Sequence, residues 1–198
     1  MKAALRSYET SIPIAWANRR SMYSALLSRG GIGVELGVER GDNAWDLLGI
    51  AQPSKLFLVD RWRRTHNAPL FVKRQEKRYG YVTERFARKT KSGRVTIFRE
   101  STDDAAHHFS KGSLDWIYID ANHVFAAVLL DIQHWAGKLK EGGVLMLHDF
   151  SLSVANGGVV EAALYELANS AVFVCLGKTG SRGEVPSVAY RHIPGGAQ

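Results

Sequence analysis

The stretch that decides the fold covers residues 114–150 and reads LDWIYIDANHVFAAVLLDIQHWAGKLKEGGVLMLHDF. It holds two short apolar runs, Leu114–Ile119 and residues 144–147, with the length and composition of buried strands. Between them, apolar residues recur at helical spacing, which predicts an amphipathic helix over residues 125–140, ended by Gly142-Gly143. Two parallel strands joined through a helix form a right-handed βαβ unit. Both strands therefore end at the same edge of a sheet.

Four titratable side chains fall at that edge. Asp120 follows the first strand, His148 and Asp149 follow the second, and His123 comes three residues after Asp120. Open α/β sheets bind ligands at the carboxyl ends of their strands. An imidazole with an ordinary pKa near 6.5 can act as a general base at neutral pH. We therefore expect Asp120, His123, His148 and Asp149 to be the catalytic group; the alternative is that the histidines only cap a helix or orient a neighbour.

The rest of the chain continues the same alternation and predicts an α/β fold with a doubly wound, mostly parallel, seven-stranded sheet. The predicted strands cover residues 32–36, 55–59, 94–98, 114–119, 144–147, 171–176 and 187–192. Further helices are expected from about residue 10 to 28, over 42–48, between 69 and 90 as one helix or two, and from 156 or 157 to 167. The loop over residues 178–184 is too short for a helix, so the last strand should be antiparallel.

Composition excludes several classes of protein. No apolar run approaches the roughly 20 residues of a membrane span, and the first residues lack the apolar core of a signal peptide. The lone Cys175 excludes a disulfide framework and a thiolate metal site. With 198 residues we expect one folded unit in the cytoplasm, with no membrane partner.

Positive charge is concentrated in one segment, residues 61–94. It holds twelve basic residues and two acidic ones, so it carries +10 while the rest of the chain carries −3. The basic residues are Arg61, Arg63, Arg64, Lys73, Arg74, Lys77, Arg78, Arg85, Arg88, Lys89, Lys91 and Arg94. Such a segment attracts nucleic acid or an anionic substrate, or is simply a solvated helix face. Our hypothesis is that it forms part of an entrance for an anionic acceptor.

The first strand and the turn after it indicate a nucleotide-type ligand. Strand Ile32–Leu36 runs into Gly37 and a helix start, but the dinucleotide fingerprint G-x-G-x-x-G is absent. Glu35 would repel a pyrophosphate, whereas it would favour a ligand with a cationic amine and a sulfonium. Asp60 ends the second strand, where an acid can accept hydrogen bonds from ribose hydroxyls.

These motifs together resemble the class I S-adenosylmethionine-dependent methyltransferases. VELGVERG (34–41) resembles the first motif of that family and LVDRW (58–62) its second. The block over residues 119–150 resembles the small-molecule group related to macrocin O-methyltransferase and cephalosporin hydroxylase. The resemblance covers residue 31 to the end. It implies the strand order 3-2-1-4-5-7-6, a methyltransferase domain over 31–198 and an N-terminal helical extension over 1–30.

The resemblance also implies the roles of individual residues. Asp120 would lie beneath the methyl donor. The other cofactor-binding residues would be Glu35, Leu36 and Gly37 at the methionine end, Asp60 at the ribose, and Arg61, Trp62, Ser101 and Thr102 around the adenine.

Metal-dependent relatives place an acid at the position of Asp120 and two polar ligands after the fifth strand. Here that implies a divalent metal ion on Asp120, His148 and Asp149. A histidine departs from the oxygen ligands that Mg²⁺ prefers, and suits Mn, Fe or Zn better. The alternative is that His148 orients Asp149 or a substrate hydroxyl without a metal.

The sequence thus predicts transfer of a methyl group from S-adenosylmethionine to a small-molecule acceptor, most simply at a hydroxyl oxygen. Three alternatives are a nicotinamide oxidoreductase, an RNA methyltransferase that uses the basic segment, and a silent S-adenosylmethionine-binding protein. The first lacks its glycine fingerprint. The pattern does not separate O- from N-methylation, and leaves nucleic acid binding and a homo-oligomer open.

Overall fold

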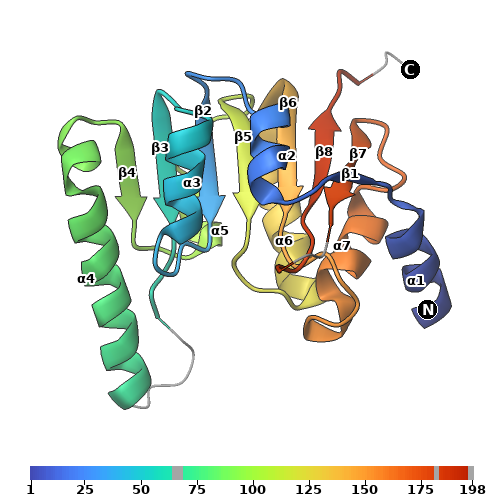
Figure 1. Ribbon diagram of the computed structural model, residues 1–198, viewed down its shortest axis with the longest axis horizontal. Helices are drawn as coiled ribbons and strands as arrows, with labels where there is room; N and C mark the ends of the chain where they lie inside the picture. The colour runs from blue at the N-terminus through green and yellow to red at the C-terminus, as the bar shows by residue number, and fades with distance from the viewer. Residues whose placement is uncertain (64–68, 181–182, 196–198) are drawn as a thin grey trace.

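One sheet of eight strands, covered by helices on both faces, organises the chain (Figure 1). The computed structural model describes residues 1–63, 69–180 and 183–195. The elements are α1 (Lys2–Ser11), β1 (Ile14–Trp16), α2 (Arg19–Leu26), β2 (Ile32–Leu36), α3 (Asp42–Ile50), β3 (Lys55–Val59), α4 (Pro69–Lys91), β4 (Val95–Phe98), α5 (Thr102–Ala106), β5 (Leu114–Ile119), α6 (Phe125–Trp135), η1 (Ala136–Lys138), β6 (Leu139–Leu147), η2 (Ala155–Gly157), α7 (Gly158–Glu166), β7 (Phe173–Thr179) and β8 (Val188–His192).

The strand order is β1-β7-β8-β6-β5-β2-β3-β4. With β2 as the first strand of the predicted fold, this confirms the order 3-2-1-4-5-7-6. Strand β8 pairs antiparallel with both β6 and β7, and the other pairs are parallel. Strands β2, β3, β5 and β6 therefore present their carboxyl ends at one edge, which faces downward in Figure 1.

The N-terminal region differs from the prediction of one helix over residues 10–28. Helix α1 ends at Ser11, β1 pairs parallel with β7 at the sheet edge, and α2 begins only after Asn18. Pro13 lacks a backbone N–H and disfavours a helical residue before it, so the chain extends here. Asn18 then caps α2 by accepting a hydrogen bond from the backbone N–H of Ser21. The sheet gains an eighth strand as a result.

The segment after α6 also differs from the prediction. Helix α6 stops at Trp135, and strand β6 begins at Leu139, where Leu139 pairs with Leu114 of β5. Gly142-Gly143 therefore lies inside β6 and does not end a helix. A Cβ on Gly143 would meet the backbone oxygen of Lys140 at 2.9 Å, so the close approach of two backbones requires glycine there.

Other boundaries shift by smaller amounts. Strand β7 covers Phe173–Thr179 instead of 171–176, so it takes up the start of the predicted loop, whose residues 181–182 lie outside the described part. Strands β4 and β8 each begin one residue later than predicted. The stretch between 69 and 90 is one helix, α4; Arg64, which belongs to the basic segment, lies outside the described residues.

Two apolar cores lie on the two faces of the sheet. One joins Val34 and Leu145 to α6 and α7, and the other joins Leu56 and Tyr118 to α2, α3 and α4. Gly33 of β2 is needed because the indole of Trp116 lies across it, 2.0 Å from where a Cβ would be. No helix in the described ranges combines the length and apolar character of a membrane span.

Candidate active site

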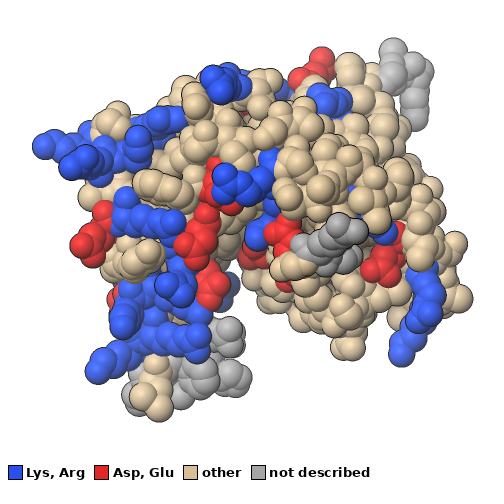
Figure 2. Space-filling view, viewed as in Figure 1, with Lys and Arg blue, Asp and Glu red and all other residues tan. Residues whose placement is uncertain are grey.

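A cleft of about 1080 Å³ opens at the carboxyl edge of the sheet. The ends of β2, β3, β5 and β6 contribute Glu35, Val59, Asp120 and His148 to its lining. In the space-filling view this region is hollowed, with acidic side chains at its centre and Lys and Arg over α4 beside it (Figure 2). The cleft is therefore where the sequence places the ligand site.

The structure brings the four predicted catalytic residues together. His123 lies between the two acids, with Nε2 3.2 Å from Asp120 Oδ1 and Nδ1 2.8 Å from Asp149 Oδ2. His148 Nδ1 lies 2.9 Å from Asp149 Oδ1 and 3.4 Å from Asp120 Oδ1, without a directed hydrogen bond to either in the described part. Asp149 has a left-handed backbone, with φ 55°, which is uncommon outside glycine and typical of functional sites.

Mutual ion pairing sets the protonation of this group. Hydrogen bonds to Asp120 and Asp149 raise the pKa of His123 to about 10. Burial would lower the pKa of His148, but the adjoining carboxylates of Asp120 and Asp149 raise it to about 9. Burial opposes ionisation of both acids, yet the two imidazoles hold the pKa of Asp120 and that of Asp149 below the ordinary value. In the ligand-free chain His123 is thus an imidazolium at neutral pH, and the ordinary pKa assumed from the sequence does not apply.

A candidate metal site lies within this group. The ligand atoms of Asp120, His123 and Asp149 all lie within 4.8 Å of one another. Among the described residues, the three side chains whose ligand atoms converge thus include His123, whereas the sequence analysis proposed His148 as the third ligand. Two carboxylates and one imidazole are a donor set that suits Mn, Fe or Zn.

Glu35 lies in the floor of the cleft with one oxygen unsatisfied. Its side chain is 1% exposed; Oε1 accepts a hydrogen bond from Asn43 Nδ2 at 3.0 Å, whereas Oε2 has no partner among the described residues. Burial raises the pKa of Glu35 to about 8. The unpaired Oε2 at the floor of the cleft is an acceptor that a donor group of a bound ligand would satisfy.

Gly37 allows two backbones to approach at the start of the cleft. Its φ is +86°, and a Cβ would lie 2.1 Å from the backbone oxygen of Asp120. Leu36 is fully buried, and its carbonyl accepts a hydrogen bond from the Asp120 N–H at 2.7 Å. Gly37 thus lines the cleft, whereas the side chain of Leu36 lies in the core below it.

Asp60, which follows β3, organises the turn after β2. Its Oδ2 accepts hydrogen bonds from the N–H groups of Val38 and Glu39, both at 3.0 Å, and its Oδ1 accepts from the Trp62 N–H at 2.7 Å. Asp60 lines the cleft as well. The carboxylate therefore fixes the turn after β2 in the ligand-free chain, and three of its four acceptor sites are already used there.

The residues expected around the adenine separate into two sets. Arg61, Ser101 and Thr102 line the cleft. Ser101 also caps α5, where its Oγ accepts from the Asp104 N–H at 3.1 Å. Trp62 is 1% exposed, donates from Nε1 to the Glu39 carbonyl and packs against Tyr79, so it supports the wall from behind.

Sequence reasoning missed several cleft residues, and three of them are polar side chains on helices α2, α3 and α6. Arg19, Asn43 and Asp131 all line the cleft. Asn43 has a local signal, because it lies in the first turn of α3, directly after the glycine turn. Asp131 is 6% exposed, and burial raises its pKa to about 6. No local sequence pattern indicates Arg19, because its position depends on the N-terminal region, where the prediction of a single helix was wrong.

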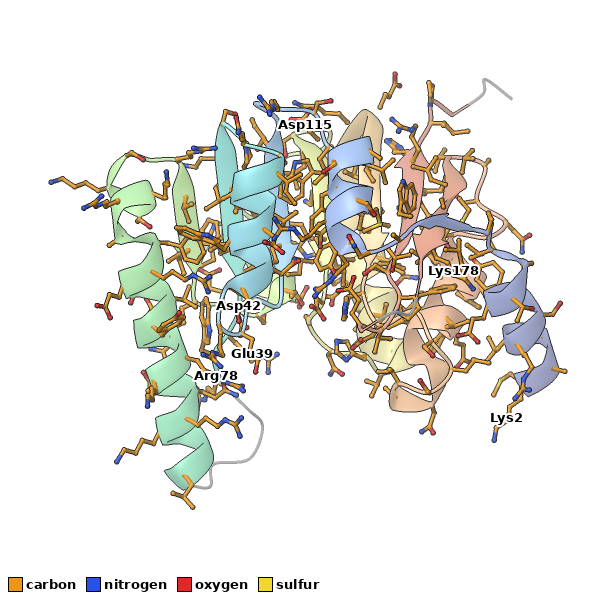
Figure 3. The ribbon with its side chains drawn as sticks, in the orientation of Figure 1. Lys2, Glu39, Asp42, Arg78, Asp115 and Lys178 are labelled. Atoms are coloured by element: carbon orange, nitrogen blue, oxygen red, sulfur yellow. The ribbon has the colours of Figure 1, made fainter. Side chains whose placement is uncertain are left out.

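The basic segment forms α4 and the wall of the cleft beside it. Several of its charges are paired: Arg78 with Glu39, Arg85 with Asp42 at 2.5 Å, and Arg99, just beyond the segment, with Glu76. Figure 3 shows Arg78 and Glu39 pointing toward each other across the gap between α4 and the turn after β2. Lys and Arg nevertheless gather over α4 in Figure 2, and Arg61, Arg63 and Arg78 line the cleft.

Comparison with known proteins bears on the family and the fold. A methyltransferase domain family model matches residues 34–150. No curated protein matches the chain. Among solved structures, the O-methyltransferase TomG from Streptomyces achromogenes, involved in tomaymycin synthesis and in complex with S-adenosylmethionine, is 14% identical, with a TM-score of 0.66 over 88% of this chain and 78% of TomG.

Two further structures share the fold. An rRNA methylase from Streptococcus thermophilus is 14% identical, with a TM-score of 0.61 over 89% of this chain and 95% of that one. Spermidine synthase from Thermotoga maritima is 16% identical, with a TM-score of 0.54 over 88% of this chain and 60% of that one. At these identities the likeness concerns the fold and not the acceptor.

The family model covers the strand-end motifs that build the cleft, from the glycine turn after β2 to the His148-Asp149 pair after β6. The unsatisfied Glu35 and the tight approach at Gly37 fit the cofactor that this family uses. The chain belongs to the methyltransferase domain family and has the fold of the class I S-adenosylmethionine-dependent methyltransferases.

Proposed function

We propose that the chain methylates a hydroxyl oxygen of a small-molecule acceptor. The observation that carries the proposal is the group of two carboxylates and two imidazoles, Asp120, His123, His148 and Asp149, in the same cleft as the unsatisfied Glu35. A hydroxyl has a pKa far above 7 and must lose its proton as it attacks, so its methylation needs nearby acid–base groups. A proton acceptor of this kind is less necessary for a neutral amine.

The residues of the cleft would divide the work as follows. When bound, S-adenosylmethionine supplies a methyl group activated by its sulfonium. Glu35 and the turn at Gly37 hold the methionine end, and Asp120 lies where the reacting groups meet. The acceptor oxygen bonds to the methyl carbon while the carbon–sulfur bond breaks, and its electron pair stays on sulfur. His123 lies between its two carboxylates and is protonated in the ligand-free chain, so its own proton first passes to solvent, after which the neutral ring takes the hydroxyl proton.

A divalent ion on Asp120, His123 and Asp149 is the second form of the same proposal. The three ligand atoms converge, and their chemistry favours Mn, Fe or Zn over Mg²⁺. An ion at this place would lower the pKa of the acceptor hydroxyl and orient it. It would also compete with the proton on His123 for the same nitrogen.

An RNA acceptor is the second candidate, favoured by the Lys and Arg side chains over α4 (Figure 2). Phosphate contacts supply much of the affinity of RNA-binding proteins, and they come mainly from such side chains. Many of these side chains are already paired or lie away from the cleft, so we favour the small molecule.

One labelling experiment tests both candidates. The chain is incubated with methyl-labelled S-adenosylmethionine and a cell extract separated into metabolite and RNA fractions. We expect label in the metabolite fraction, as a base-stable ether, and a loss of about 100-fold or more for Asp149→Asn. His192→Asn is the matched control, because His192 contacts the Lys140 carbonyl away from the cleft.

Label confined to RNA would overturn the small-molecule proposal, and label on nitrogen would overturn the hydroxyl. Exhaustive chelation separates the two forms of the mechanism. If a divalent ion takes part, chelation abolishes transfer and Mn²⁺ restores it more effectively than Mg²⁺. Full activity after chelation leaves His123 as the proton acceptor.

A further inference from the structure

The methionine end of the cofactor carries a carboxylate as well as an amine, and the cleft offers Glu35 only for the amine. Five arginines line the cleft. Arg40, Arg61, Arg63 and Arg78 come from the turn after β2, the segment after β3 and α4, on the side of the cleft next to α4. Arg19 comes from the first residue of α2, which begins at the carboxyl edge of the sheet beside α3 (Figure 1).

Arg19 is joined to Glu35 through one residue. Asn43 Nδ2 donates to Glu35 Oε1 at 3.0 Å, and Asn43 Oδ1 accepts from Arg19 Nη1 at 3.5 Å and from the Tyr23 hydroxyl at 2.7 Å. The side-chain amide of Asn43 therefore lies between the carboxyl of Glu35 and the guanidinium of Arg19 and contacts both. Because the amine and the carboxylate of an amino acid sit on one carbon atom, the groups that bind them must be neighbours, as Glu35 and Arg19 are.

A second contact holds the guanidinium at the cleft. Glu184, from the segment before β8, accepts from Arg19 Nε at 2.7 Å and from the Arg19 backbone N–H at 2.9 Å. Among the described residues, the directed hydrogen bonds of the guanidinium use Nε and one N–H of Nη1, and the Tyr118 hydroxyl also lies close to it. The guanidinium has five N–H groups, so others remain for a ligand. The side chain is 28% exposed, which leaves it open to the cleft.

We infer that Arg19 binds the carboxylate of the methionine moiety while Glu35 binds its amine. The inference rests on the cofactor assignment and adds to it a residue outside the matched family stretch of 34–150. Glu184, which holds Arg19 in place, also lies outside that stretch. The N-terminal segment and the region before β8 would thus complete the amino-acid pocket of this chain.

Calorimetry with two ligands tests the inference without relying on activity. S-adenosylhomocysteine carries both the amine and the carboxylate, and its decarboxylated analogue keeps only the amine. For Arg19→Met we expect the Kd of S-adenosylhomocysteine to rise about 10- to 100-fold, the loss of charge-assisted hydrogen bonds. The Kd of the decarboxylated analogue should change by no more than about twofold, because the group that Arg19 binds is missing.

Arg20→Met is the matched control. Arg20 is the next residue of α2, pairs with Asp46 at 2.5 Å and does not line the cleft, so both affinities should stay at the wild-type value. Arg19→Lys keeps the charge and should fall between wild type and Arg19→Met for S-adenosylhomocysteine alone. If Arg19→Met fails to fold, this variant carries the same comparison.

The outcomes are distinct. Equal losses for the two ligands would show that Arg19 only supports the pocket, and no loss for either would show that the carboxylate binds elsewhere; both overturn the inference while the cofactor assignment stands. Failure of the wild-type chain to bind S-adenosylhomocysteine at all would overturn the cofactor assignment itself.

Discussion

Glu35 makes the ligand-free chain less stable than a neutral residue would, because its carboxyl is buried with one oxygen unpaired. Burial raises its pKa to about 8 in the folded chain, from an ordinary value of 4.5. The folded chain therefore keeps a proton that the unfolded chain releases, and stability is lost as the pH rises between these two values. Below that window the carboxyl is neutral in both states and costs nothing further.

Glu35→Gln should remove this loss. Relative to wild type, the free energy of unfolding of the ligand-free variant should rise between about pH 5 and pH 8.5, by an amount on the order of a few kcal/mol. Urea unfolding at the two pH values measures the difference. Glu141→Gln, at an exposed position of β6, should show no such trend. A constant difference for Glu35→Gln would mean that the carboxyl is solvated or already paired.

The same variant should bind S-adenosylhomocysteine more weakly, since it cannot carry the negative charge that faces the amine.

How much of the site the sequence can predict depends on where each residue gets its position. Asp120, His148 and Asp149 follow buried apolar strands, so periodicity alone places them at one edge. Arg19 reaches the cleft through a contact with Glu184, which is 165 residues away in the chain. No local pattern records such a contact. The pKa of His123 is likewise a tertiary property, because it is set by two carboxylates that converge only in the fold.

Among the elements, the strands with the fewest alternatives were predicted with correct ends. Strands β2, β3 and β5 are short apolar runs bounded by glycine or charge, and each could be buried only as a strand. Strand β1 was not predicted, and a helix was expected in its place, because its three residues pair only when β7 offers its edge. The prediction for the start of β6 failed because Leu139 suits the apolar face of a helix and the core of a sheet equally well.

Strand β2 depends on a glycine that sequence periodicity does not explain. Gly33→Ala should destabilise the chain by about 2–4 kcal/mol, because the new Cβ would overlap the buried indole of Trp116, whose atoms lie from 2.0 Å away. Gly80→Ala provides the matched control: Gly80 lies exposed within α4 with nothing within 4 Å of its Cβ position. It should stabilise the chain by about 0.5–1 kcal/mol through helix propensity. Thermal and urea unfolding measure both changes. Equal effects would mean that Trp116 can move away from β2 at little cost.

At the scale of the whole molecule, charge is distributed unevenly about the cleft. Acidic groups lie at the ends of the strands, and arginines form the wall toward α4 (Figure 2). Lys2 of α1, by contrast, lies at the opposite end of the molecule (Figure 3). Both signs of charge therefore line the cleft, and arginines attract anionic groups to the part of it that they border. We propose that the arginine wall favours an acceptor that carries a phosphate or a carboxylate.

Charge reversal on the cleft wall tests this preference. Arg63 lines the cleft and is exposed, so Arg63→Glu should raise the KM of the acceptor about 3- to 30-fold and leave kcat within about twofold, since only encounter and ground-state binding are weakened. The Kd of S-adenosylhomocysteine should hardly change, because Asp60 and Glu35 are retained. Added salt should also raise the wild-type KM, because salt weakens the attraction between exposed charges and, at physiological ionic strength, largely screens those more than about 8 Å apart. Arg88→Glu makes the same charge change at an exposed position of α4 outside the cleft lining, and should leave the KM unaltered. Initial rates with a labelled methyl donor give KM and kcat, and calorimetry gives the Kd of S-adenosylhomocysteine.

If Arg63→Glu and Arg88→Glu raise the KM equally, the field of the whole helix attracts the acceptor. If neither does, and salt has no effect, the acceptor is neutral or enters from the side of α2 and α7.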